Sequence, residues 1–161
     1  MTGTNNSHYL LPGNLFAHPE EHSVLTVLGS CVSVCLWDPR KGIGGINHFM
    51  LPFWNGEGLA SPRFGNIAIV RLIDKMLALG ADRRNLQAKV FGGGDMLKAT
   101  SACMNIGQRN IVLAQDMLRD ERLPVVGSDT GGKHGRKLLF NTRSGVVLVK
   151  PLARQIDDLN I

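Results

Sequence analysis

The chain has 161 residues, of which 43% are hydrophobic and 19% are charged. A chain of this length is expected to bury roughly 70% of its unfolded surface, so it fits one globular domain that needs no metal or disulfide to fold. This composition excludes disordered and collagen-like proteins. The formal net charge of +5 is compatible with nucleic acid, an anionic membrane surface or an acidic protein as partner.

The basic residues are scattered along the chain, and the densest group lies at residues 133–137. Without a basic tail or a basic amphipathic helix, nucleic acid is not the expected partner. Apolar runs such as 67–70 and 145–149 fall far short of the ~20 residues that a bilayer span requires, so we expect no direct membrane insertion. Residues 1–8 lack the features of a secretory signal, which favours a cytoplasmic location.

Three cysteines, Cys31, Cys35 and Cys103, are an odd number, and a reducing cytoplasm disfavours pairing any two of them. Cys31 and Cys35 have no second Cys/His pair close by in the sequence, so no zinc site is expected. We expect neither a metal nor a cofactor.

In chain order, residues 1–22 contain Pro12, Gly13 and Pro19 among polar residues, which predicts an irregular lead-in before a domain at 23–152. Residues 24–28 predict a buried strand, interrupted by Gly29 and Ser30 just before Cys31. Residues 32–37 alternate with a period of two, 38–42 carry turn residues, and 43–51 resume an extended pattern. Together they predict a β-hairpin.

The rest of the domain alternates helices with strands. Amphipathic periodicity predicts helices at 63–80 and 110–122. Strands are predicted at 86–91, 124–128, 137–142 and 146–150, the last two joined by a turn at 143–145, with a peripheral tail at 153–161. The expected fold is α/β: a single-domain layered sandwich of a mixed β-sheet with packed helices and β-hairpins.

The first predicted hairpin brings a cysteine and a histidine together. A short loop at 38–42 places Cys31 opposite His48 or Phe49 in the antiparallel register. Directly opposed residues have Cβ atoms about 4.5–5.5 Å apart, so a thiol and an imidazole on one face can meet. The sequence therefore predicts a local Cys31/His48 pair.

This pair has the chemistry of a nucleophile and its general base. A free thiol ionises near pH 8.5, roughly, and an adjacent imidazolium would raise its thiolate fraction. The same imidazole can protonate a departing amine and then activate water. Thr26 is the nearest hydroxyl that could orient His48, and backbone N–H groups around 29–31 are candidate donors to an oxyanion.

Structural roles are the alternative for each of these residues. Cys31 could be a small buried hydrophobe and His48 a hydrogen-bonded sheet histidine. We interpret Cys35 and Cys103 as packing residues. Residues 92–94, three consecutive glycines, lack the ending of a phosphate loop and predict a tight turn. The loop at 129–134 is predicted to connect two strands. The alternative is that it lines a substrate groove.

Several blocks of sequence occur in an order that is typical of one family. They are Leu28-Gly29-Ser30-Cys31-Val32, Asp38-Pro39, residues 44–52, Arg63-Phe64-Gly65, residues 88–93, Ile106-Gly107-Gln108-Arg109-Asn110 and residues 129–136. Over residues 23–150 the chain closely resembles the CheD family of chemoreceptor glutamine deamidases.

The resemblance implies an α/β layered domain that hydrolyses glutamine side chains of methyl-accepting chemotaxis receptors, often in a complex with the CheC phosphatase. The family's catalytic Cys and His fall on Cys31 and His48. Its Thr falls on Thr26, one residue nearer the Cys than in some members. Because receptor signalling helices are glutamate-rich, a charge of +5 would steer the protein toward them.

Two other functions remain open at this point. One is a non-catalytic module that docks on a CheC-type phosphatase or on a receptor and regulates it by occupancy. The other is a related transferase or amidase, in which the same Cys/His pair admits an amine instead of water or acts on a different amide.

Overall fold

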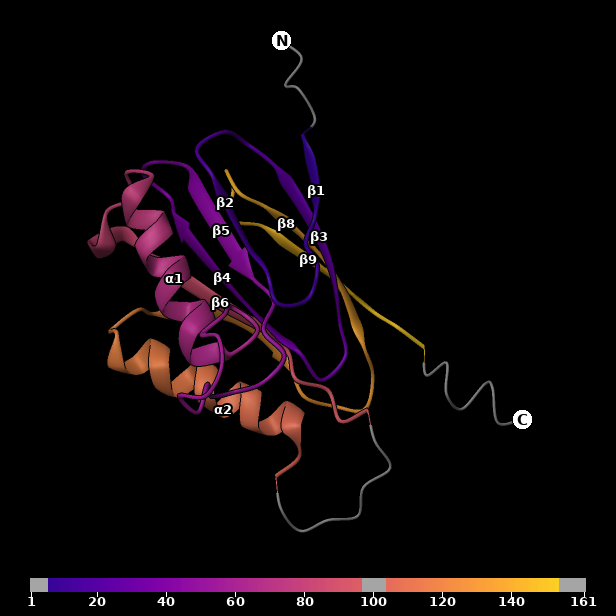
Figure 1. Ribbon diagram of the computed structural model, residues 1–161. Helices are drawn as coiled ribbons and strands as arrows, with labels where there is room; N and C mark the ends of the chain where they lie inside the picture. The colour runs from indigo at the N-terminus through magenta and orange to yellow at the C-terminus, as the bar shows by residue number, and fades with distance from the viewer. Residues whose placement is uncertain (1–5, 97–103, 154–161) are drawn as a thin grey trace.

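A computed structural model of the chain describes residues 6–96 and 104–153. Its elements form three layers, in which two helices cover one face of a larger β-sheet and a smaller sheet covers the other face (Figure 1). The predicted α/β layered sandwich is confirmed, with two mixed sheets in place of one. None of the described helices is long and apolar enough to cross a bilayer.

The smaller sheet has the strand order β1-β3-β8-β9. Its strands are β1 (Ser7–Tyr9), β3 (Ser23–Leu28), β8 (Arg136–Asn141) and β9 (Val147–Pro151). The larger sheet has the order β2-β5-β4-β6-β7. Its strands are β2 (Leu15–His18), β4 (Val32–Asp38), β5 (Ile43–Asn47), β6 (Gln87–Gly92) and β7 (Val125–Thr130). Parallel pairing is confined to β1 with β3 and β6 with β7 among these strands.

Strand β4 lies at the centre of the molecule, and its predicted alternation is confirmed. Val32, Val34 and Leu36 pack in the core beneath the helices, whereas Cys35 packs in the core between the two sheets. Both faces are therefore buried, and the strand's polar residues, Ser33 and Asp38, are buried with them.

The two helices confirm the amphipathic patterns, and the largest boundary shift is at the start of the second helix. Helix α1 (Gly65–Ala78) ends just before Gly80, whose φ of +104° suits a glycine. Helix α2 (Ile106–Asp120) begins four residues before the predicted start at Asn110. The reason is a capping box, in which the side chains of Asn105 and Gln108 each accept a hydrogen bond from the other's backbone N–H. A short 3₁₀ helix, η1 (Arg83–Asn85), precedes β6.

The N-terminal segment departs from the prediction of an irregular lead-in at 1–22. It contains β1, which pairs with β3, and β2, which pairs with β5. Each strand gives the segment's backbone groups partners at the edge of a sheet, an effect that local composition does not reveal. Cys103 and the predicted tail, apart from residue 153, lie outside the described residues.

The register of the first hairpin also differs from the prediction. Asp38 pairs with Ile43, so it belongs to the strand and the loop is shorter than assumed. The Asp38 carboxylate closes that loop by accepting hydrogen bonds from the backbone N–H groups of Arg40 and Lys41. The register continues to a bridge between Val32 and Phe49, which places Cys31 opposite Met50 and not opposite His48 or Phe49.

Candidate active site

Cys31 lies in the turn at which the chain crosses from the smaller sheet to the larger one, between β3 and β4. Three successive carbonyl groups of this turn each accept a hydrogen bond. The Gly29 carbonyl accepts from the Gly94 N–H at 2.9 Å, and the Cys31 carbonyl accepts from the Gly93 N–H at 2.8 Å. The Ser30 carbonyl accepts from the side-chain amide of Asn110 at 3.1 Å. The turn is therefore held from one side along its whole length.

The opposite side of the same peptides presents N–H groups. In a trans peptide the N–H points away from the C=O of the preceding residue. Because the Gly29 and Ser30 carbonyls point into the protein, the N–H groups of Ser30 and Cys31 point the other way. Neither has a backbone acceptor among the described residues. The Cys31 N–H forms a hydrogen bond that lowers the pKa of the Cys31 thiol, so this donor lies beside the sulfur.

Residues 92–94 have a structural role that explains their composition. A Cβ on Gly92 would lie 2.3 Å from the Cys31 carbonyl oxygen, and a Cβ on Gly93 would lie 2.3 Å from Ile111. Both residues also have positive φ angles. The glycine run is thus the tight turn predicted from sequence, and glycine is required by its packing against the Cys31 turn at Gly92 and against α2 at Gly93. Gly29, in contrast, has no positive φ, and a Cβ there would make a tight contact of 3.3 Å with the Met96 side chain.

His48 follows β5 and is buried between the two sheets, with 1% of its surface exposed. Its Nδ1 lies 2.7 Å from the Thr26 hydroxyl on β3. The Thr26 hydroxyl in turn donates to the Leu10 carbonyl at 2.8 Å. The structure therefore brings together two of the three predicted site residues, Thr26 and His48, from different sheets.

This chain of contacts determines the tautomer of His48. A threonine hydroxyl has a single proton, and a carbonyl can only accept, so the Thr26 proton points to Leu10. Thr26 must then accept a hydrogen bond from Nδ1–H of His48. The other ring nitrogen, Nε2, carries the lone pair and is the basic atom. This is the tautomer that a general base requires.

Asn47 interrupts the ladder between β4 and β5 beside His48. The backbone N–H of Val34 donates to the Asn47 side-chain oxygen at 2.8 Å. The His48 N–H turns outward and donates to the Asn14 carbonyl at 3.1 Å. The backbone pairing between β4 and β5 is therefore interrupted next to His48.

Cys31 and His48 lie on the inter-sheet side without a hydrogen bond between them. Cys31 packs against the inter-sheet core. In the observed register the two residues are diagonal neighbours, which in antiparallel strands lie roughly 7–8 Å apart, within reach of longer side chains. Hydrogen bonds between catalytic groups are often long before substrate binds. The register therefore makes the two residues neighbours, and no hydrogen bond joins them.

Burial sets the protonation states of both groups. It raises the pKa of the Cys31 thiol, opposed by that residue's own N–H, and it lowers the pKa of His48 to about 4. At neutral pH the resting site therefore holds a thiol and a neutral imidazole. The expectation that an imidazolium at His48 raises the thiolate fraction is wrong for the resting site, because burial disfavours both charges.

Asn110 contacts the Cys31 turn, and the sequence analysis did not single it out as a candidate. Its side-chain amide donates to the Ser30 carbonyl and to the Met50 carbonyl, each at 3.1 Å. It is fully buried on α2, on the same face as Gly107 and Ala114. The signal in the sequence is a polar residue within a buried helical stripe, and it is visible only when the helix is started at its true cap.

The other candidates make structural contacts. Cys35 is buried in the inter-sheet core, and burial raises the pKa of its thiol strongly, which fits the predicted packing role. In the loop predicted to connect strands, Asp129 and the Gly131 carbonyl accept hydrogen bonds from buried Arg136. Within the described residues, no cluster of three His, Cys, Asp or Glu side chains could hold a metal ion.

Comparison with known proteins identifies the family. Residues 50–151 match the family model described as CheD chemotactic sensory transduction. The chain is 54% identical over 142 residues to the "Probable chemoreceptor glutamine deamidase CheD" of Trichlorobacter lovleyi, covering 88% of each protein. It is 44% identical over 144 residues to the protein of the same name from Sulfurimonas denitrificans, covering 88% of this chain and 92% of the relative. This chain belongs to the CheD family.

Proposed function

We propose that this chain is a protein-glutamine deamidase that converts glutamine side chains of chemotaxis receptors into glutamate, with Cys31 as nucleophile. The names of its relatives give the reaction and the substrate. The observation that supports it best is the contact of Thr26 with His48 at 2.7 Å, which leaves Nε2 as the basic atom of a buried imidazole.

In the first half-reaction, the Cys31 sulfur attacks the carbonyl carbon of the glutamine amide while its proton passes to Nε2 of His48. Transfer during attack is required because the resting thiol is neutral. The negative charge that forms on the amide oxygen is stabilised by the N–H groups of Ser30 and Cys31. The C–N bond then breaks, His48 protonates the leaving ammonia, and a thioester remains.

In the second half-reaction, water attacks the thioester and gives its proton to His48. The C–S bond breaks, the carboxylic acid of glutamate is released, and the sulfur recovers its proton. The net reaction consumes one glutamine amide and one water and yields glutamate and ammonia. Thr26 holds the imidazole in the same tautomer at the start of both half-reactions.

The charge of the protein suits this substrate. A net charge of +5 steers the enzyme toward glutamate-rich receptor helices. Each turnover adds a carboxylate, which alters repulsion between helices and creates a group that can be methylated. Because the proposed substrate is a receptor's cytoplasmic helices, the proposal includes a cytoplasmic location for the enzyme.

The decisive experiment incubates the purified protein with a receptor cytoplasmic fragment and measures ammonia release and the mass gain at glutamine. We expect the wild-type protein to convert specific glutamines. Cys31→Ala should lose activity on the order of 10⁴-fold or more, as for the loss of other covalent nucleophiles. The matched control is Cys35→Ala, which removes the neighbouring buried thiol and should retain turnover. Equal mass gains with Cys31→Ala would refute the proposal.

A complex with a CheC-type phosphatase is a further part of the proposal, supported by the family resemblance. Co-purification of the two proteins tests it. If Cys31→Ala supported normal chemotaxis in cells, the protein would be a docking module and not an enzyme. If the acyl group passed to an added amine in preference to water, it would be a transferase.

A further inference from the structure

Asn110 connects the two backbone segments that carry the proposed catalytic groups. Ser30 directly precedes Cys31, and Met50 follows His48 by two residues. Both carbonyls are acceptors of one side-chain amide at 3.1 Å. An asparagine NH₂ group has two protons, so a single side chain satisfies both carbonyls and sets the distance between them.

The bond to Ser30 also sets the orientation of a peptide plane. The Ser30 carbonyl and the Cys31 N–H belong to one rigid peptide unit. Fixing the carbonyl on Asn110 therefore fixes the direction of the N–H beside the sulfur. Gly93 and Gly94 fix the flanking carbonyls of Cys31 and Gly29 through backbone bonds. The Ser30 carbonyl is the only one of the three that is held by a side chain.

Asn110 is also an unfavourable choice for stability alone. Its side-chain oxygen is buried without a hydrogen-bond partner in the described part of the chain. An unsatisfied buried acceptor is destabilising, and asparagine is a poor helix former in a helix interior. A local cost of this kind, at a position adjoining the site, is typical of a functional residue.

We propose that Asn110 is a positioning residue that aligns the Cys31 N–H with the oxyanion formed when Cys31 attacks a carbonyl. This inference rests on the proposed function, since it assigns Asn110 a part in the same reaction. It predicts that Asn110 matters for reactions that pass through an oxyanion and not for the nucleophilicity of the thiol itself.

The test compares two reactions of Cys31 in the full chain. p-Nitrophenyl acetate acylates a thiol through a tetrahedral oxyanion, whereas iodoacetamide alkylates it by direct displacement without one. For Asn110→Ala we expect acylation to slow on the order of 10- to 100-fold, as when an oxyanion donor is misplaced, and alkylation to change less than about threefold. Receptor deamidation should lose kcat in parallel with acylation, at nearly constant KM.

Gln108→Ala is the matched control, because it disrupts the capping box of the same helix without touching the Cys31 turn. It should leave the ratio of acylation to alkylation unchanged. If Asn110→Ala does not fold, Asn110→Ser retains one donor and should give a smaller loss in the same ratio. If the folded Asn110→Ala variant had an unchanged ratio of acylation to alkylation, including the case in which both rates fall together, the proposal would be overturned.

The two proposals fail in different ways. A wild-type protein that is acylated but never deamidates receptors would refute the proposed substrate, while the ratio would still measure the role of Asn110. A wild-type protein that deamidates receptors, with an Asn110→Ala variant of unchanged ratio, would refute only the role of Asn110.

Discussion

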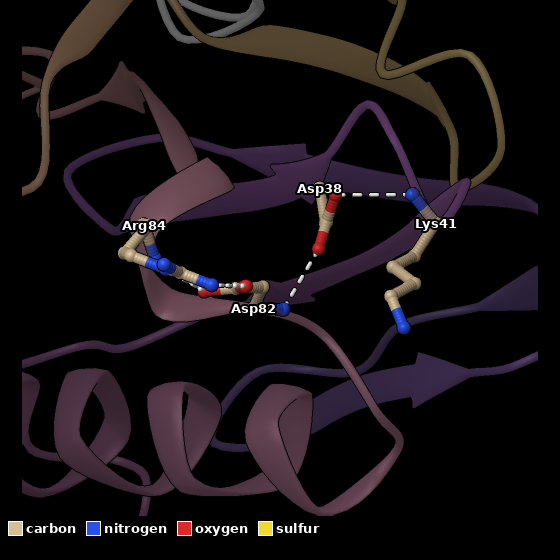
Figure 2. A network of polar contacts seen from close by, with 4 residues as sticks. All are labelled: Asp38, Lys41, Asp82 and Arg84. Atoms are coloured by element: carbon tan, nitrogen blue, oxygen red, sulfur yellow. Dashed lines mark hydrogen bonds and ion pairs between the residues drawn. The ribbon is translucent and has the colours of Figure 1, made fainter.

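The two ends of strand β4 differ in whether their buried polar groups have hydrogen-bond partners. At the far end, the Asp38 carboxylate accepts hydrogen bonds from the backbone N–H groups of Arg40, Lys41 and Asp82. Arg84 pairs with Asp82 beside it (Figure 2). Burial opposes ionisation of Asp38, but the hydrogen bonds outweigh it and lower the pKa of this carboxyl. This end is fully satisfied.

The end at Cys31 has several unsatisfied polar groups. Five buried side-chain atoms have no hydrogen-bond partner in the described residues, and none of them is at the Asp38 end. They are Ser33 Oγ, Asn47 Nδ2, Asp95 Oδ1, Asn110 Oδ1 and Arg136 Nη1. Each lies on or next to a segment that pairs with the Cys31 turn or carries His48. The hydrogen bonds at the Asp38 end stabilise the fold. The unsatisfied polar groups at the other end destabilise it, close to the proposed catalytic residues.

Replacing His48 gives the largest expected effect and separates the two ends by activity. His48→Gln removes the general base, so deamidation should fall on the order of 10³- to 10⁴-fold, as for other lost acid-base groups. The measurement is the initial rate of ammonia release. His18→Gln, at the distant edge of the larger sheet, is the matched control and should keep full activity. A wild-type rate in His48→Gln would remove this histidine from the mechanism.

Replacing Asp38 should lower the stability of the fold and leave activity unchanged. Asp38→Ala leaves three backbone donors without their acceptor, so the free energy of unfolding should fall by about 3 kcal/mol, at ~1 kcal/mol for each bond. Urea denaturation measures this loss. Well below the transition, kcat should equal that of the wild type. A large fall in kcat of the folded variant would show that the two ends are coupled.

The pH dependence of stability sharpens the contrast. The folded chain keeps His48 neutral down to a pKa of about 4, whereas an unfolded imidazole is protonated near pH 6.5. The stability present above about pH 6.5 is therefore lost as the pH falls toward 4, by about 3 kcal/mol at ~1.4 kcal/mol per pH unit. Because the pKa of Asp38 is lowered in the folded chain, its contribution to stability is lost only at a pH below this range.

The measurement is the difference in unfolding free energy between wild type and His48→Gln across that range. The variant should lose less stability between pH 6.5 and 4. The activity profile should show its acid limb well below pH 6.5 for the same reason. An acid limb at the ordinary imidazole pKa would contradict the burial of His48 in the working enzyme.

Thr26 gives the smallest expected effect. Thr26→Val keeps the shape but removes the acceptor for Nδ1–H, so the imidazole loses its fixed tautomer. A neutral hydroxyl contributes less than a carboxylate in this position, and we expect kcat to fall about 10- to 100-fold with little change in KM. Thr26→Ser, which retains the hydroxyl, is the control. Steady-state kinetics on the receptor fragment distinguishes the two variants.

The sequence by itself determined most of the elements after residue 22 and the chemical types of the candidate residues. Alternation in β4 and the stripe on α1 survive in the structure because periodicity records which side of an element is buried. Local pattern also identified Cys31, His48 and Thr26 as candidates. It assigned the wrong register to the first hairpin, because whether Asp38 belongs to strand or loop depends on hydrogen bonds to Arg40, Lys41 and Asp82.

Only the tertiary structure decided how these groups meet. The contact between Thr26 and His48 crosses from one sheet to the other, and its tautomer depends on the carbonyl of Leu10, in a segment predicted to be irregular. Asn110 reaches the Cys31 turn from a helix far along the chain. Side-chain periodicity carries no information about which elements lie together, so the protonation and alignment of the site emerge only when the layers pack.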